Sequence, residues 1–321
     1  MKKSIKVVGI TLLSLFIVAI IAVAFLLIKN HIDSKKPMIE DMYYKNFQSK
    51  AILEKKYAGL GSYEVSQVKL KSEDNLIKEY SIWYPRELEN KQQMYPLIVV
   101  TNASNTAASV YEPFFERLAS WGFIVVGNED KQAGSGLTTS KTLDDVLALN
   151  KNAESVLYGK IQQDHIGALG YSQGGAGALR AVTEYKNSSK YKTIFTGSAA
   201  YPLLAKNMGW RYDISKVNIP YFMSAGTGKS DDSGEDSKTS FGGVAPLSSL
   251  IENYNKISNN VFKIRARVSG AEHWDMNRAD GYMTAWMLYQ LQDDPEAGSV
   301  FLGKNAEILR NSNWQDIQKN K

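Results

Sequence analysis

Short, strongly apolar runs that alternate with amphipathic stretches restrict the fold of this sequence more than any other feature. Two of these runs, at residues 95–100 and 122–127, read YPLIVV and GFIVVG and are almost continuously apolar. Such runs are typical of strands covered on both faces, and strands that alternate with helices form a mainly parallel sheet. We therefore expect an α/β fold with an eight-stranded, mostly parallel sheet flanked by helices. The expected strands span residues 63–70, 77–84, 97–101, 123–127, 166–171, 193–197, 221–225 and 261–268.

Helical patterns fill most of the segments between these runs. They span residues 111–121, 142–158, 173–185, 246–257 and 279–291, with one more near 298–311. The connection at 198–220 is too short to hold a large lid domain. Residues 226–245 are rich in Gly, Ser and Asp, which indicates a surface loop. We therefore expect one α/β domain without a large lid.

An uncharged, apolar segment at residues 7–28 differs from everything that follows it. As a helix it would reach about 33 Å, which is enough to cross a bilayer. The lysines that precede it favour an N-terminus inside the cell, so the rest of the chain would face outside. An A-x-A pattern at residues 22–24 permits cleavage as a signal peptide instead, but the apolar run continues past it, which favours retention.

These patterns predict a transmembrane helix ahead of the folded part. We expect residues 1–36 to form a membrane anchor with its flank, residues 37–60 a tether, and residues 61–321 the catalytic domain. The protein would then be a single-pass protein of the cell membrane with an extracellular catalytic domain. If the N-terminal segment is cleaved, it would be secreted.

Charge and cysteine content exclude several classes of function. The formal net charge is +5, but residues 1–36 hold six lysines and one aspartate and account for all of it. The remainder is balanced, so the folded part lacks the basic excess of a nucleic-acid-binding protein. The sequence contains no cysteine, which excludes disulfides, thiolate metal sites and a cysteine nucleophile.

A serine surrounded by glycines follows the fifth expected strand. Residues 170–174 read GYSQG and match G-x-S-x-G, the nucleophile elbow, in which a serine sits on a strained turn between a strand and a helix. Glycines two residues before and after Ser172 remove β-carbons that would collide where the backbone doubles back. A serine N-cap ahead of a glycine-rich helix is the simpler reading, but the strand before the motif and the helix after it favour a nucleophile.

A serine nucleophile needs a histidine base within hydrogen-bond reach. Of the three histidines, His31 flanks the apolar segment and His165 lies at the start of the strand that leads to Ser172. His273 follows the last expected strand, where its imidazole could reach the carboxyl ends of the sheet. Elimination and position therefore both select His273.

An acid between the serine and the histidine should orient the imidazole and stabilise its charged form. Asp231 comes five residues after the seventh strand run and is the best placed carboxylate, with its neighbour Asp232 second. Two backbone amides should stabilise the oxyanion: that of Gln173, and one from the loop after the third strand. Ser104 is the candidate in that loop, with Ala103 where a glycine is more usual.

At this point the chain resembles the α/β-hydrolase superfamily. Four stretches carry the resemblance: VVTNASNTAASVYEPFFERLASWGFIVV, GALGYSQGGAGAL, FMSAGTGKSD and SGAEHWDM. They are similar to polyester hydrolases (cutinase-like) and to the dienelactone hydrolase and chlorophyllase groups, over most of residues 60–311. The resemblance implies a Ser172, Asp231, His273 triad that hydrolyses carboxylic esters through an acyl-enzyme. It also places Ser104 where polyester hydrolases carry an aromatic residue.

We expect the protein to be a membrane-anchored serine esterase. It would hydrolyse small acyl esters or lipids without a cofactor or a metal. Its cleft would be open, with Tyr201, Trp210 and Trp274 as candidate wall residues. Two alternatives remain: an acyltransferase or peptidase with the same triad, and a non-catalytic binding module on a hydrolase scaffold. The sequence leaves the natural acyl and alcohol groups and the oligomeric state open.

Overall fold

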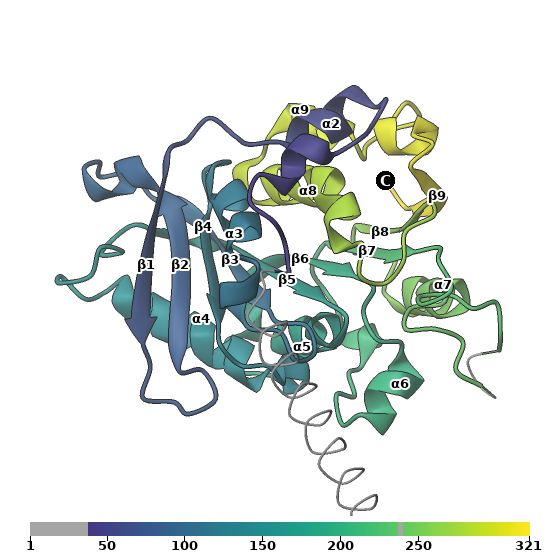
Figure 1. The fold of residues 1–321 in the computed structure, drawn as a ribbon, viewed down its shortest axis with the longest axis horizontal. Coiled ribbons are helices and arrows are strands. Elements are labelled where there is room, and N and C mark those ends of the chain that lie inside the picture. Colours follow the sequence, from purple (N-terminus) through teal and green to yellow (C-terminus); the bar gives the residue numbers. More distant parts are fainter. Residues whose placement is uncertain (1–37, 237–239) are drawn as a thin grey trace, which may run out of the picture. The chain divides into compact units, whose positions relative to one another are not determined.

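A nine-stranded mixed sheet forms the centre of the molecule (Figure 1). A computed structural model describes residues 38–236 and 240–321. The strands lie in the order β1-β2-β4-β3-β5-β6-β7-β8-β9. Their bounds are β1 Val65–Lys71, β2 Glu79–Pro85, β3 Tyr95–Thr101, β4 Ile124–Asn128, β5 Ile161–Tyr171, β6 Tyr191–Gly197, β7 Tyr221–Gly226, β8 Lys263–Val268 and β9 Trp314–Lys319.

The six strands from β3 to β8 run parallel, while β1, β2 and β9 are antiparallel additions at the two edges. Every residue of β3 and β4 is buried, as their continuously apolar sequences require. The parallel arrangement brings the carboxyl ends of β3, β5, β7 and β8 to one edge of the sheet. Loops that follow these strands carry the candidate site.

Helices cover both faces of the sheet (Figure 1). On one face α3 and α8 bury aromatic and aliphatic side chains against the strands, and on the other face α4, α5 and α7 do the same. The bounds are α3 Glu112–Ala119, α4 Leu137–Leu149, α5 Gln173–Ala181, α6 Pro202–Asn207, α7 Leu247–Lys256, α8 Asp280–Gln292 and α9 Pro295–Ser299. The sheet therefore has a separate hydrophobic core on each side.

The C-terminal part departs from the sequence prediction. The expected eight strands become nine, and the expected helix at 298–311 is absent: the chain forms the short α9, a 3₁₀ turn at Glu307–Arg310 and then β9. Phe301 and Ile308 are fully buried, so the apolar residues that suggested a helix here do face the core. They enter the core from turns and not from a helix. In β9, Trp314 is buried while the residues after it are partly or fully exposed, and its strand pairs with β8. A single strand at an edge gives too short a period-2 pattern to be recognised.

Helix α4 also differs from its expected range of 142–158. It begins at Leu137 and ends at Leu149, because the side chain of Asn150 turns back to accept hydrogen bonds from the backbone amides of Lys160 (2.8 Å) and Ile161 (2.9 Å). This amide contact ends the helix and fixes the start of β5. Asn150 ends α4 through partners that lie ten and eleven residues later in the chain. The helical periodicity of the sequence gives no sign of such a contact.

The expected membrane helix at 7–28 lies outside the described residues. Within residues 38–236 and 240–321, no helix is long and apolar enough to cross a bilayer. The expected tether at 37–60 contains α2 (Ile52–Ala58), which packs against α8. Its Glu54 is fully buried, and its carboxylate accepts hydrogen bonds from Asn311 (2.8 Å) and Asn313 (2.8 Å). Residues 39–321 form one compact unit.

A buried ion pair links α3 to α8. Arg117 and Asp280 are 0 % and 1 % exposed, and their charged groups lie 3.3 Å apart. The guanidinium also donates to the Thr284 hydroxyl (2.8 Å), the Tyr57 carbonyl (3.0 Å) and the Tyr43 hydroxyl (2.8 Å). Burial raises the pKa of Asp280 above its ordinary value, although the positive charge of Arg117 opposes this shift.

Replacing Arg117 with methionine should lower the free energy of unfolding by about 3–5 kcal/mol, because the Asp280 carboxylate would stay buried without its cation. Urea denaturation followed by circular dichroism measures this change. The double variant Arg117→Met/Asp280→Leu is the matched control and should recover much of the loss, since no buried charge remains. A single variant as stable as the unmodified protein would contradict this role of the pair.

Candidate active site

Ser172 occupies a sharp turn between β5 and α5. Its backbone has φ 55° and ψ −124°, a conformation that costs energy in any residue with a side chain. The flanking glycines are required by space: a β-carbon on Gly170 would lie 2.1 Å from the carbonyl oxygen of Gly174, and one on Gly174 would lie 2.2 Å from that of Thr101. The local geometry is thus that of the elbow which the sequence motif predicts.

His273 joins this serine to a buried carboxylate. Its Nε2 lies 2.8 Å from the Ser172 Oγ, and its Nδ1 lies 2.6 Å from Oδ1 of Asp231. Ser172 comes from the end of β5, Asp231 from the loop after β7 and His273 from the loop after β8. The parallel sheet therefore assembles three side chains that lie up to 101 residues apart in the sequence.

The Asp231 carboxylate is fully buried and has a fixed orientation. Its Oδ2 accepts a hydrogen bond from the backbone amide of Gly226 (2.7 Å) and another from the Ser198 hydroxyl. These two donors leave Oδ1 to face His273. Ser198 follows β6 and has a positive φ of 46°; no sequence motif indicated its part in the site.

Asp232, the second candidate acid, points elsewhere. Its Oδ2 lies 2.5 Å from the Arg267 guanidinium and 3.2 Å from the backbone nitrogen of Leu247. Arg267 is also paired with Asp316 on β9, at 2.7 Å. Asp232 therefore anchors the acid loop to the edge of the sheet, and Asp231 alone of the two contacts the imidazole.

A polar clamp holds the acid loop against the histidine loop. Ser230 donates both its backbone N–H (3.0 Å) and its hydroxyl to the Glu272 carboxylate, and the Ser230 Oγ accepts the backbone N–H of His273 (2.7 Å). Each residue of the clamp is the sequence neighbour of a triad residue. The clamp therefore fixes the distance from Asp231 to His273 through their backbones. No sequence motif marks Ser230 or Glu272, so the clamp could not be predicted from the sequence.

The clamp predicts a pH dependence. The hydrogen bonds from the Ser230 hydroxyl and amide lower the pKa of Glu272. A lowered pKa in the folded state means that its contribution to stability is present above the unfolded pKa, about 4.3, and is lost as the pH falls through the lower folded value. Glu272→Gln should thus lower the melting temperature more at pH 7 than at pH 3, measured by differential scanning fluorimetry. An equal difference at both pH values would contradict a charged clamp.

The two expected oxyanion donors lie on neighbouring segments. Gln173 is the first residue of α5, and Ser104 lies in the loop after β3, which passes directly beside α5. Asn102 holds this loop: its side-chain amide donates to the carbonyls of Asn128 (2.7 Å) and Asp130 (2.7 Å), and its oxygen accepts the Tyr111 hydroxyl. No sequence motif indicates this role of Asn102.

The three candidate wall residues have different environments. Trp274, next to His273, is 66 % exposed, whereas Tyr201 is buried and bonds through its backbone nitrogen to the Val244 carbonyl (3.0 Å). Trp210 is half-buried against Gly134. Of the other two histidines, His165 lies in β5, and His31 lies outside the described residues.

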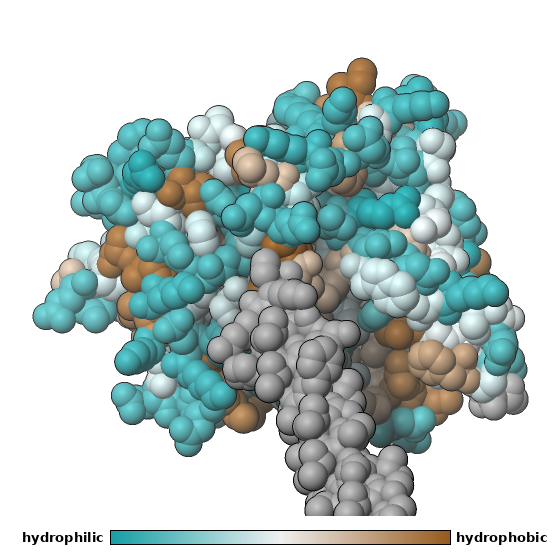
Figure 2. Space-filling model, in the orientation of Figure 1, coloured by the Kyte–Doolittle hydropathy of each residue, from teal (hydrophilic) through white to brown (hydrophobic). Residues whose placement is uncertain are grey.

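An open pocket of about 790 Å³ lies between α6 and α7. Tyr201, Leu203 and Ile251 contribute its apolar lining. Figure 2 shows brown, apolar atoms gathered where Figure 1 places these two helices. Tyr201 belongs to the loop whose Ala200 bonds to the Ser172 carbonyl (3.3 Å), so this pocket begins close to the elbow.

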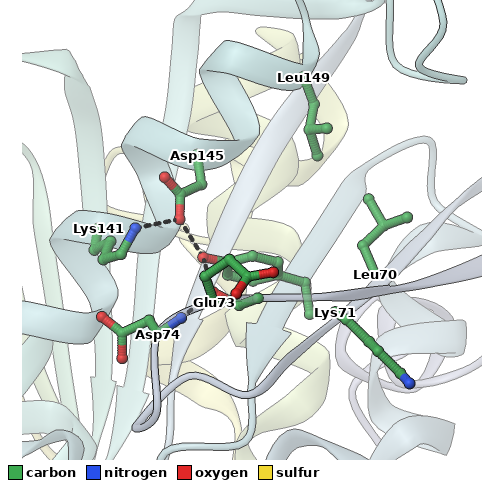
Figure 3. A pocket seen from close by; sticks show the side chains of 9 residues that line it. Leu70, Lys71, Glu73, Asp74, Lys141, Asp145 and Leu149 are labelled. Atoms are coloured by element: carbon green, nitrogen blue, oxygen red, sulfur yellow. Dashed lines mark hydrogen bonds and ion pairs between the residues drawn. The ribbon is translucent and has the colours of Figure 1, made fainter.

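A second pocket, of about 530 Å³, lies between α4 and the loop that joins β1 to β2 (Figure 3). Its polar groups bond to one another: Lys141 (2.8 Å) and the Tyr80 hydroxyl both contact the Asp145 carboxylate, and Asp74 accepts the backbone amide of Leu76 (2.9 Å). These residues stabilise the hairpin loop. No group of three or more metal-ligating side chains occurs in the described part of the chain.

The chain is similar in sequence to known ester hydrolases. The sequence profile of a family described as PET hydrolase-like, or PETase, matches residues 49–319. Cutinase est1 from Thermobifida alba is 25 % identical over 226 residues, which cover 67 % of this chain and 65 % of the cutinase. The match therefore spans slightly less than two thirds of the length of that relative. The matched family region includes every candidate site residue.

Proposed function

The chain belongs to the PET hydrolase-like family of α/β hydrolases, and from this premise we propose that it is a serine esterase that hydrolyses carboxylic esters. The observation that carries the proposal is the position of His273, within hydrogen-bond distance of both Ser172 and Asp231. A serine nucleophile, a histidine base and a buried carboxylate in this order suffice for acyl transfer.

The proposed reaction begins when the Ser172 hydroxyl attacks the acyl carbon and His273 Nε2 takes its proton. The imidazolium then donates through Nδ1–H to Asp231, whose negative charge stabilises it. The backbone amides of Gln173 and Ser104 stabilise the oxyanion. His273 returns the proton to the leaving alcohol, and a water molecule, activated by the same imidazole, releases the acid from the acyl-enzyme.

We propose that substrates are esters with an apolar acyl or alcohol part. The exposed indole of Trp274 beside His273 supports this class, and Tyr201, Leu203 and Ile251 add apolar surface to the pocket between α6 and α7. The family description and the related cutinase make polyesters one candidate. Ser104 lacks the aromatic ring that polyester hydrolases carry at this position, so small acyl esters and lipids are the preferred candidates.

We further propose that residues 7–28 anchor the protein in the cell membrane with the catalytic domain outside, on the basis of their apolar sequence. Full-length protein should sediment with membranes and resist extraction at high salt, whereas a chain that begins at residue 37 should remain in the supernatant. Recovery of the full-length chain in the soluble fraction would contradict anchoring.

The test of the esterase activity is active-site labelling. The protein should hydrolyse p-nitrophenyl butyrate, and one equivalent of a fluorophosphonate should abolish this activity. The Ser172 oxygen displaces fluoride, so the peptide that contains Ser172 should gain the mass of the reagent less HF. A panel of esters of increasing chain length, together with polyester films, then defines the substrate class. Folded protein that cleaves none of these esters, or a label on a different serine, would overturn the proposal.

A further inference from the structure

A chain of side-chain amides connects the two segments that carry the oxyanion donors. The Gln173 Nε2 donates to the Gln132 Oε1 (3.1 Å), and the Gln132 Nε2 donates to the Asn105 Oδ1 (3.0 Å). Gln173 follows the nucleophile, and Asn105 follows Ser104. From this chain, which we call the amide relay, we infer that Gln132 and the side chains of Gln173 and Asn105 position the oxyanion hole. The inference rests on the proposed esterase function.

The loop that carries Gln132 is itself rigid. The Gln132 backbone nitrogen donates to the Asp130 Oδ1 (2.8 Å), and the other Asp130 oxygen accepts the Thr138 hydroxyl (2.7 Å). Asn102 bonds to the Asp130 carbonyl in the same loop. The relay therefore starts from a fixed point between β4 and α4 and can transmit that position to both donor segments.

Asn105 needs such support because of its backbone. It has a φ of 57°, which an L-residue adopts at a cost, and its backbone nitrogen bonds to the Lys131 carbonyl (2.9 Å). The neighbouring Ser104 is exposed. Two bonds from the loop at 129–132, one to the backbone and one to the side chain, hold Asn105 beside the donor.

The buried amide of Gln173 supports a positioning role. Gln173 is fully buried, and its Oε1 has no hydrogen-bond partner among the described residues. A buried acceptor without a partner destabilises the fold, and methionine would fill a similar volume without that cost. The glutamine amide is thus unfavourable for stability, and its one bond leads along the relay. This combination is typical of residues that trade stability for function.

The test uses the full chain with Gln173→Met and Gln132→Met, singly and together, and with exposed Gln92→Met as the matched control. Both single variants should lower kcat about ten- to hundredfold with KM unchanged, because a misplaced donor loses part of its contribution to the transition state. The double variant should be no slower than the slower single, since both changes break one relay. Gln173→Met should melt no lower than the unmodified protein.

A second readout separates positioning from general damage. The inhibition constant of a boronic acid that bonds to Ser172 and directs an oxygen to the oxyanion hole should rise in proportion to the loss of kcat. The midpoint of the acidic limb of the pH–rate profile should stay constant, because the triad is untouched. If the unmodified protein is active, two results would overturn the positioning role of the amide relay. One is an unchanged kcat in the variants, and the other is a fall in kcat together with a fall in melting temperature. An inactive unmodified protein would instead overturn the proposed esterase function.

Discussion

Ester hydrolysis is expected to fall by about 10⁶-fold in kcat when Ser172 is replaced by alanine, because the reaction loses its nucleophile. The imidazole of His273 and the backbone donors would remain, but they have no covalent intermediate to form or stabilise. Binding of the ester should persist, since the removed hydroxyl is small. Progress curves with p-nitrophenyl butyrate at high enzyme concentration measure the residual rate.

Stability provides the control for this variant. Alanine accepts the same backbone angles as serine, and Ser172 bonds through its side chain only to His273 among the described residues. The melting temperature should therefore stay close to that of the unmodified protein. A folded variant that retains more than about 1 % of the activity would exclude Ser172 as the nucleophile.

The elbow could be predicted from sequence because its cause is local. Ser172, Gly170 and Gly174 lie within five residues, and the collision that excludes a β-carbon at Gly170 arises inside the same turn, although the one at Gly174 involves the end of β3. The inner parallel strands could be predicted for a similar reason, since burial on both faces leaves a continuous apolar run. His273 could be identified because the sequence offers so few histidines.

The supports of the site could not be predicted, because they depend on contacts between distant segments. Ser198 follows β6 yet bonds to Asp231, and Ser230 bonds to Glu272, 42 residues away. Serine and glutamate are common surface residues, and neither position has a motif. The same limit applies to Asn102, whose burial follows only from the packing of three loops at the end of the sheet.

The choice between Asp231 and Asp232 shows this limit most sharply. The two residues are adjacent and chemically identical, and in the sequence only their distance from the seventh strand run ranks Asp231 ahead of Asp232. In the structure, consecutive residues of the turn point in different directions. One carboxylate faces the buried amide of Gly226, and the other faces Arg267. Partners from β7 and β8 therefore give the two carboxylates different roles, which the sequence could only rank.

Asparagine at position 231 is accordingly expected to lower kcat by about 10⁴-fold. The Gly226 amide and the Ser198 hydroxyl both donate to the Oδ2 side, so the asparagine carbonyl should occupy that side and its NH₂ group should face His273. The NH₂ group would then donate to Nδ1, which forces the proton onto Nε2. An imidazole with a proton on Nε2 cannot accept the proton of Ser172.

Asp232→Asn is the matched control, because it makes the same chemical change one residue away. It should reduce stability because it weakens the ion pair with Arg267, although Arg267 keeps its bond to Asp316. It should leave kcat within about threefold of the unmodified value, because the side chain of residue 232 does not contact His273. Steady-state kinetics at pH 8 and melting curves of both variants make the comparison. Equal losses of kcat in the two variants, or the larger loss in Asp232→Asn, would show that Asp231 does not orient the catalytic histidine.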